Sequence, residues 1–400
     1  MREGIRGALE QFKVLSRDTK LLLLASFLIG IYWSILFVVF QFYLLEAGYN
    51  ATMIGLVGFI RNIISTFLML FSGFIGDYYG RRRVTLLGFF LVFLGLLISA
   101  FSPSLLIILL GSSLIGIGGS LGYPCLLALF TDTIKSKEEM NFVFGLQSFS
   151  MSISFAVGSG LGWLPQILQD LGLESIFTFQ ITLLLTSIIM LLSLFPVIIT
   201  KVKDVKKKRR FTFKLKSRDV VIRFAIINSI IGIGAGLTVA LFPTYFERKF
   251  MVSSGEMGTL QASADIINAF AYLSASRLAQ LFGGVITISY SSALSVLALI
   301  LIPISPNFLI ASFPFIVRQS LVNLGFPLIY SLMMKLAHKE ERATVIGLSN
   351  FFWSLTFSLA QPIGGYMIDF VWVDLPLIIT GIFYLFYSLF VYILFSKQDR

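Results

Sequence analysis

Charged residues are scarce in this sequence. They make up 13% of the 400 residues, whereas soluble domains carry roughly 25%. Apolar residues make up 57%, and the mean hydropathy is +0.90. A water-soluble particle of this size could not cover its surface with so few charges, and 41 Phe and 14 Tyr residues exclude a disordered chain. The composition therefore predicts an all-α integral membrane protein that crosses the bilayer many times.

Cysteine and histidine are almost absent. Cys125 is the only cysteine, so no disulfide can form within the chain, and His338 is the only histidine. Asp265 is the only carboxylate in the middle of a long apolar stretch, which leaves no carboxylate pair for acid–base chemistry. These absences disfavour a membrane-embedded enzyme. We expect no metal site and no cofactor.

Twelve apolar stretches are long enough to cross a bilayer core about 30 Å thick, which takes roughly 20 helical residues. Connections of only a few residues, at 46–51, 102–104 and 303–305, predict antiparallel neighbours. The first stretch is too long for a signal-peptide core, and no small-residue cleavage pattern follows it. The predicted spans are 21–45, 52–75, 84–101, 105–130, 141–165, 176–199, 221–246, 254–279, 284–303, 306–334, 343–370 and 374–396.

The basic residues are distributed unevenly between the two sides of the membrane. Most of the 31 Lys and Arg residues lie in the N-terminal segment, the middle segment and the loops on the same side, whereas the opposite loops hold only Arg248 and Lys249. The positive-inside rule then places both termini in the cytoplasm. The net charge of +11 faces anionic lipid headgroups, so it does not indicate a nucleic-acid partner. We expect a monomer in the plasma membrane.

The chain contains an internal repeat. Residues 136–149 read SKEEMNFVFGLQSF and residues 338–351 read HKEERATVIGLSNF, and the pair at 76–80 and 279–283 has nearly the same offset. Repeats of this kind build membrane transporters. The predicted organisation is an N-terminal six-helix bundle at 1–199, a basic cytoplasmic linker at 200–219 and a C-terminal six-helix bundle at 220–400.

A glycine-rich motif lies between the second and third predicted spans. Residues 73–84, GFIGDYYGRRRV, resemble the signature G-x-x-x-D-x-x-G-R-[KR] of the major facilitator superfamily, with Gly73, Asp77, Gly80, Arg81 and Arg82 in register. The resemblance implies a secondary transporter built from two pseudo-symmetric bundles that works by alternating access. It also implies that Asp77 faces the start of the eleventh span when the protein opens outward, and that spans 1, 4, 7 and 10 line the cavity. Gly73 is expected to permit close helix approach and Gly80 a tight turn.

The chain departs from the family pattern in several places. Gln280 replaces the acidic residue in the second copy of the motif, and Ser112 stands where the fourth span often carries Arg. The segment GSGLG at 158–162 lacks the proline of drug antiporters, whereas a Pro-x-Gly-Gly sequence occurs at 362–365. These departures disfavour a proton-driven drug antiporter. We expect the glycines at 116–122 and 158–162 to pack helices together rather than to bind phosphate.

Three charged residues lie in the middle of predicted spans. Arg61, Asp265 and Arg318 are at depths of roughly 14, 16 and 18 Å at 1.5 Å per helical residue, all close to the midplane. Charges at this depth are costly and usually functional. Two interpretations remain open: a structural ion pair between Asp265 and one arginine, or a site where an arginine binds an anionic group while Asp265 takes up a proton or balances the charge.

Other polar and aromatic residues in the spans are weaker candidates. Gln147 belongs to a small, polar face of the fifth span that either lines a cavity or packs against the eighth span. That face also contains Ser150, Ser154 and Gly158. Among the aromatic residues within spans 1, 4 and 10, some are expected to contact substrate, and the candidates are Tyr32, Trp33, Tyr123 and Tyr330.

The two arginines favour a small, anionic solute as the substrate, moved by a proton or another ion gradient. The alternative within the class is an efflux transporter for apolar compounds. A membrane-embedded enzyme or a scramblase is disfavoured.

Overall fold

A computed structural model describes residues 12–134, 136–202 and 216–398. All regular structure in these residues is helical. The helices are α2 (Arg17–Glu46), α3 (Ala51–Tyr79), α4 (Arg81–Phe101), α5 (Leu105–Thr133), α6 (Lys137–Gly160), α7 (Leu164–Asp170), α8 (Ser175–Leu192), α9 (Leu194–Ile199), α10 (Arg218–Thr238), α11 (Phe242–Phe250), α12 (Ser254–Phe282), α13 (Gly284–Ile304), α14 (Phe308–Leu336), α15 (Arg342–Phe370) and α16 (Leu375–Phe395), with 3-10 turns η1 (Leu161–Trp163), η2 (Val239–Leu241) and η3 (Ser396–Gln398).

Three of the predicted spans are interrupted. The fifth runs through α6, η1 and α7, the sixth through α8 and α9, and the seventh through α10, η2 and α11. Each break lies shortly before or at a proline, namely Pro165, Pro196 or Pro243. Proline has no amide hydrogen and its ring clashes with the preceding turn, so the chain re-forms its helix after each break. The breaks were not predicted. When the helices on either side of each break are counted as one segment, the described residues form twelve helical segments, which correspond to the twelve predicted spans.

Eleven of the twelve segments are long and apolar enough to cross a membrane by length and composition, and α12 is the exception among the described residues. It has 29 residues, which is sufficient length. Its sequence contains Gln261, Asp265 and Asn268, which lower its hydropathy. Polar residues are tolerated in a membrane helix when they face other helices or water. Helix α12 packs against α6 and α14.

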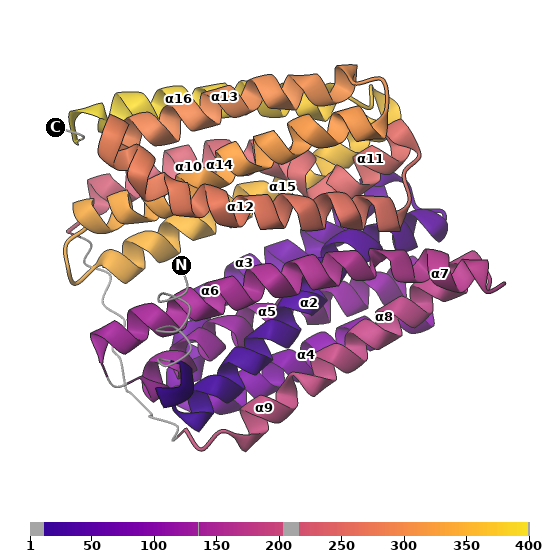
Figure 1. Cartoon of the computed structure of the whole chain (residues 1–400), viewed down its shortest axis with the longest axis horizontal. Helices are drawn as coiled ribbons and strands as arrows, with labels where there is room; N and C mark the ends of the chain where they lie inside the picture. The colour runs from indigo at the N-terminus through magenta and orange to yellow at the C-terminus, as the bar shows by residue number, and fades with distance from the viewer. Residues whose placement is uncertain (1–11, 135, 203–215, 399–400) are drawn as a thin grey trace.

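The helices lie in two groups (Figure 1). Helices α2–α9 form the lower group in indigo to pink, and α10–α16 form the upper group in pink, orange and yellow. Across the interface, α3 packs against α15 and α6 against α12. Both ends of the described chain lie at the same end of the molecule, on the left of Figure 1, which we name the terminal end. The other end is named the distal end. The predicted linker at 200–219 lies largely outside the described residues.

Glycines allow neighbouring helices to approach closely. A Cβ atom on Gly118 of α5 would collide with the backbone of α4 at Gly88, and one on Gly122 would lie 2.6 Å from the ring of Phe89. The glycine sequence at 116–122 therefore packs α5 against α4, as predicted. At Gly80, which joins α3 to α4, φ is 102°. The tight turn in the motif thus has a backbone conformation that favours glycine.

Candidate functional site

Helices α3 and α15 form much of the interface between the two groups. Beginning at the distal end, Gly55 lies so close to α15 that a Cβ atom there would be 2.5 Å from the carbonyl oxygen of Gln361. Further along, the hydroxyl groups of Thr66 and Ser354 are 2.5 Å apart, and the rings of Phe67 and Phe351 meet edge to face. The two helices therefore remain in contact over about three turns of α3.

Hydrogen bonds join the two groups at the distal end. The carboxylate of Asp369, near the end of α15, accepts from the backbone amides of Ala51 (3.1 Å) and Thr52 (2.7 Å) and from the Thr52 hydroxyl (2.6 Å). This carboxylate thus caps the N-terminus of α3 from the other group. On α2, Gln41 donates to the carbonyl of Ala240 (2.9 Å) and accepts from Thr244 (2.8 Å).

A second set of distal contacts joins α6 and η1 to α12. The Ser254 hydroxyl donates to the carbonyl of Gly162 (2.9 Å), and the indole of Trp163 donates to Thr259 (2.8 Å). A Cβ atom on Gly258 would collide with the backbone of Ser159. The distal end is therefore closed on both sides of the interface.

At the terminal end, the motif residues make contacts within their own group. Asp77 and Arg81 form an ion pair at 2.9 Å, and Arg81 also binds Asp132 of α5 at 2.9 Å. Arg82 donates to the carbonyls of Val197 and Ile198 at the end of α9. In this conformation Asp77 binds Arg81, and its pairing with the start of α15 in the outward-open state stays a prediction.

Gly73 does not make the close contact that we expected of it in this conformation. A Cβ atom there would meet no other atom within 4 Å. The space beside it shows that α3 is separated from its neighbours on this face, although the same helix is tightly packed nearer the distal end.

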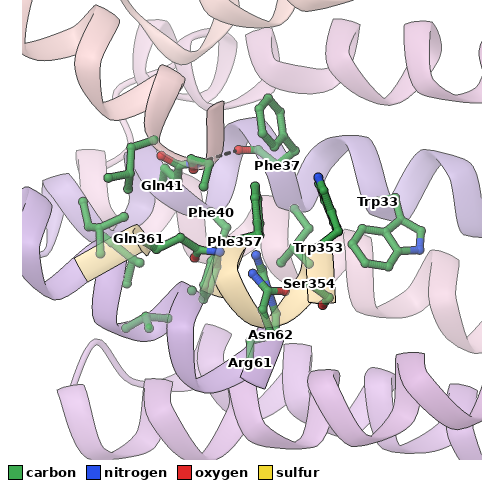
Figure 2. A pocket seen from close by; sticks show the side chains of 17 residues that line it. Trp33, Phe37, Phe40, Gln41, Arg61, Asn62, Trp353, Ser354, Phe357 and Gln361 are labelled. Atoms are coloured by element: carbon green, nitrogen blue, oxygen red, sulfur yellow. Dashed lines mark hydrogen bonds between the residues drawn. The ribbon is translucent and has the colours of Figure 1, made fainter. Parts of the chain in front are cut away.

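A cavity of about 310 Å³ lies between the two groups, beneath the distal contacts. Its walls come from α2, α3, η2 and α15, which are parts of spans 1, 2, 7 and 11 (Figure 2). The expectation of spans 1, 4, 7 and 10 is therefore correct for two of the four. Helices α3 and α15 supply the rest of its lining. The lining residues are Trp33, Leu36, Phe37, Phe40, Gln41, Leu44, Ile54, Val57, Gly58, Arg61, Asn62, Ala240, Leu241, Trp353, Ser354, Phe357 and Gln361.

The lining is mostly aromatic and aliphatic, with a few polar groups. The polar groups of Gln41 and Ser354 already have protein partners, as described above. The Nε atom of Arg61 and the Nε2 atom of Gln361 are buried and have no hydrogen-bond partner. Two unused donors therefore belong to one cavity.

Arg61, Asp265 and Arg318 do not form a cluster. Asp265 accepts from Gln261 on its own helix at 3.0 Å, and no ion pair joins it to either arginine among the described residues. Arg318 is 3% exposed within the C-terminal group, where it donates to Tyr384 and lies over the rings of Phe242 and Tyr384 at 5.4 and 5.2 Å. The structural ion pair that we considered is therefore absent from this conformation, and of the three residues only Arg61 lines the cavity.

The remaining candidates lie beside the cavity or in helix contacts. Trp33 lines the cavity, whereas Tyr32 is 2% exposed and its hydroxyl has no hydrogen-bond partner. Tyr123 accepts a hydrogen bond of 3.4 Å from Gln147, so these two predicted residues meet inside the N-terminal group. Tyr330 donates to Asn350 at 3.2 Å.

Ser154 and Gly158, on the polar face of α6, pack against the first span. A Cβ atom on Gly158 would be 2.6 Å from the carbonyl oxygen of Ile31, and one on Gly30 would collide with the Ser154 side chain. Both interpretations of this face are therefore wrong for Ser154 and Gly158. Their small size allows α2 and α6 to approach closely.

Sequence reasoning missed Asn62 and Gln361. Both are neutral amides in apolar helices, and such groups seldom occur in a membrane without a partner or an aqueous cavity. That signal was present in the sequence, but it does not tell which face of the helix carries the amide.

Comparisons with known proteins agree with this architecture. The sequence model of the Major Facilitator Superfamily matches residues 22–225 and 224–400. Two uncharacterized transporters are similar in sequence, one from Buchnera aphidicola subsp. Schizaphis graminum (strain Sg), 26% identical over 191 residues, and one from Buchnera aphidicola subsp. Acyrthosiphon pisum (strain APS), 29% identical over 188 residues. Each match covers 47% of this chain and 47% or 45% of the relative, so the chain spans about half the length of these relatives.

Solved structures of transporters share the fold. A bacterial homologue of the human lysosomal transporter Spinster, in an inward-facing and unoccupied conformation, has a TM-score of 0.74 at 14% identity and covers 96% of this chain and 98% of its own. A peptide transporter in complex with alafosfalin has a TM-score of 0.74 at 14% identity, with coverage of 95% and 94%. The nucleoside transporter NupG has a TM-score of 0.72 at 12% identity, with coverage of 95% and 98%. This multi-pass membrane protein therefore belongs to the Major Facilitator Superfamily.

Proposed function

We propose that this transporter is a secondary carrier in the plasma membrane that moves a small solute with an anionic group by alternating access of the cavity beneath the distal contacts. The observation that supports this proposal is Arg61. Its guanidinium lines the cavity, and no carboxylate lies within 4.0 Å of it among the described residues.

An unpaired cation is costly inside a membrane protein. A substrate carboxylate or other anion would supply the missing partner, while a cationic substrate would add repulsion. The aromatic lining, which includes Trp33, Phe37 and Trp353, suits an apolar body attached to that anionic group. The volume of about 310 Å³ is at the lower end of the range for small-molecule sites, which favours a small solute.

The orientation of the protein decides which state the structure represents. The positive-inside rule places the terminal end in the cytoplasm. The closed distal end then faces outward, and the structure corresponds to the inward-facing state of the transport cycle. The chain as a monomer provides both groups of helices, so we propose no further subunit.

Energy is proposed to come from a proton or another ion gradient. Asp265 is the candidate for coupling because it is a carboxylate in the membrane whose one hydrogen-bond partner, Gln261, is neutral. Asp265 does not line the cavity that contains Arg61, so coupling would act through the relative movement of the two groups of helices and not through direct competition.

Efflux of apolar compounds remains the second candidate, favoured by the aromatic lining of the cavity. The two functions differ in how they depend on charge. An apolar compound needs no partner for Arg61, so its transport should survive loss of the guanidinium.

The test is a thermal-shift screen on the purified protein, followed by uptake into proteoliposomes. The panel contains small carboxylates, their uncharged amides, a nucleoside, a dipeptide and apolar cations. We expect carboxylates to raise the melting temperature by mass action, and Arg61→Gln to abolish the shift while Arg61→Lys retains part of it. Stabilisation by neutral or cationic compounds alone, unchanged in Arg61→Gln, would overturn the proposal.

A further inference from the structure

The two unused donors of the cavity come from different groups of helices. Arg61 belongs to α3 and Gln361 to α15, and the Nε atom of the first and the Nε2 atom of the second are both buried without a partner. Gln361 is only 2% exposed. A buried donor without an acceptor is costly, and such groups in a native protein require an explanation.

The fold places these two side chains on the same wall of the cavity. A Cβ atom on Gly58 would collide with the Oε1 atom of Gln361, so the amide group lies directly on Gly58. Gly58 and Arg61 are three residues apart on α3, which puts them on the same face of the helix. The Gln361 amide therefore lies on α3 about one helical turn from Arg61. The close-up of the cavity labels both side chains (Figure 2).

Local sequence holds Gln361 in this position. Gly55 and Gly58 let the backbone of α15 approach α3, and the next residue, Pro362, lies 2.9 Å from the Cβ position of Gly55. The oxygen end of the amide rests against Gly58, which leaves the NH₂ end to face elsewhere. The donor is thus presented by packing and not by a hydrogen bond.

We propose that the carboxylate of the substrate bridges the two groups of helices. One carboxylate oxygen accepts from the Arg61 guanidinium of α3, and the other accepts from the Gln361 amide of α15. This inference rests on the proposed anionic substrate and names its class. The rest of the substrate is an aromatic ring, because Trp33, Trp353 and Phe357 form the neighbouring wall. Trp353 and Phe357 are stacked with centroids 4.7 Å apart and present a flat surface. The substrate class is a small aromatic monocarboxylate.

A ligand held by both groups has a second effect. Its affinity depends on the distance between α3 and α15, so it favours the state in which the two helices remain in contact at this depth. The neutral donor of Gln361 and the charged donor of Arg61 together also explain a preference for acids over amides. A ligand with a primary amide in place of the carboxylate lacks the negative charge and offers only one acceptor atom.

The test uses the full-length protein in lipid nanodiscs, with phenylacetate, 3-phenylpropionate and indole-3-acetate as probes, each beside its primary amide. The measured quantity is the ratio of affinities for acid and amide. Gln361→Met removes the donor at similar volume, and Gln361→Glu places a carboxylate beside Arg61. Gln280→Met is the matched control on the exposed terminal part of α12.

We expect the wild-type protein to prefer the acid and Gln361→Met to reduce this preference roughly 10- to 100-fold, as loss of a hydrogen bond to a charged group does. Gln361→Glu should abolish acid binding because it pairs with Arg61, and Gln280→Met should change nothing. A preference that is lost in Arg61→Gln but kept in both Gln361 variants overturns the bridge and leaves the proposed function intact. No acid preference in the wild-type protein, or one unchanged in Arg61→Gln, overturns both.

Discussion

Two arginines lie inside the membrane, and their surroundings differ. Arg318 has a hydroxyl and two aromatic faces around it, which disperse its charge without an acid. The Nε atom of each arginine is buried without a partner, but only Arg61 lines the cavity. We expect the first arrangement to stabilise the C-terminal group of helices. On the proposed function, the second costs stability and provides a binding group. Function and stability are therefore carried by different residues of the same type.

Substitution by glutamine should separate the two roles. Without ligand, Arg61→Gln should raise stability by roughly 1–3 kcal/mol because an unpaired buried charge is replaced by a neutral amide. Arg318→Gln should lower stability by a similar amount because the bond to Tyr384 is lost, while the preference for acids over amides is retained. Thermal unfolding of both variants in detergent, with and without phenylacetate, checks this. A lower melting temperature for ligand-free Arg61→Gln would contradict it.

Glu341 makes stability depend on pH at the terminal end. Its carboxylate accepts from the backbone amides of Lys216 and Ser217 at 2.7 Å each, and the bond from Lys216, followed by the side-chain bond with Ser217, lowers the pKa of Glu341 below its usual value of 4.5. A lowered pKa contributes stability that is present above that usual value and is lost as pH falls through the folded-state pKa. The contact ties the start of α10 to the start of α15.

We therefore expect Glu341→Ala to melt at a lower temperature than the wild-type protein at pH 7. The difference should persist down to about pH 4.5 and shrink below it, because the wild-type carboxylate becomes protonated there. Melting curves of the two proteins between pH 3 and pH 7 provide the measurement. A difference that is constant over this range would show that the carboxylate charge has no part in the contact.

At the scale of helices, α3 carries an acidic contact at each of its ends. At the distal end its N-terminus is capped by Asp369 of α15, and at the terminal end it supplies Asp77. Only the distal contact crosses between the groups in this state. Opening the distal end must break all three hydrogen bonds to Asp369.

Asp369→Asn should shift the protein toward the state with an open distal end. A carboxylate at a helix N-terminus is worth roughly 0.3–1 kcal/mol, and up to about 2 when partly buried, which corresponds to a shift of a few-fold to about thirtyfold. Spin labels at Ser102→Cys and Ser305→Cys, in a background without Cys125, report the distance across the distal end. Asp77→Asn should shift the distribution in the opposite direction, so equal shifts for both variants would refute the two-ended scheme.

The sequence predicts where the helices lie better than it predicts which side of each helix faces the cavity. Depth is predicted by counting residues, and a shared predicted depth for Arg61, Asp265 and Arg318 suggests a cluster, which this conformation does not contain. Rotation about each helix axis depends on packing, and packing directs Arg318 into its own group and Asp265 toward Gln261. Gln361 was missed for the same reason, because only the packing of α15 on Gly58 places its amide beside the cavity.

At the scale of the whole molecule, the charge distribution predicts which end faces the cytoplasm. Ser136 lies at the terminal end and is exposed, and Met251 lies at the distal end with 80% exposure. In cells that produce a protein without Cys125, Ser136→Cys should react with an impermeant thiol reagent only after the membrane is permeabilised. Met251→Cys should react in intact cells. The reverse pattern would invert the topology and make this conformation outward-facing.

The placement of tryptophan gives the protein a built-in optical signal. Of the four tryptophans, Trp33 and Trp353 line the cavity, Trp163 is hydrogen-bonded across the distal contact, and Trp372 is 52% exposed. Occupation of the cavity therefore changes the environment of two emitters, and opening of the distal end changes that of a third. Single-tryptophan variants would let fluorescence follow loading and gating separately, in real time, without any attached dye.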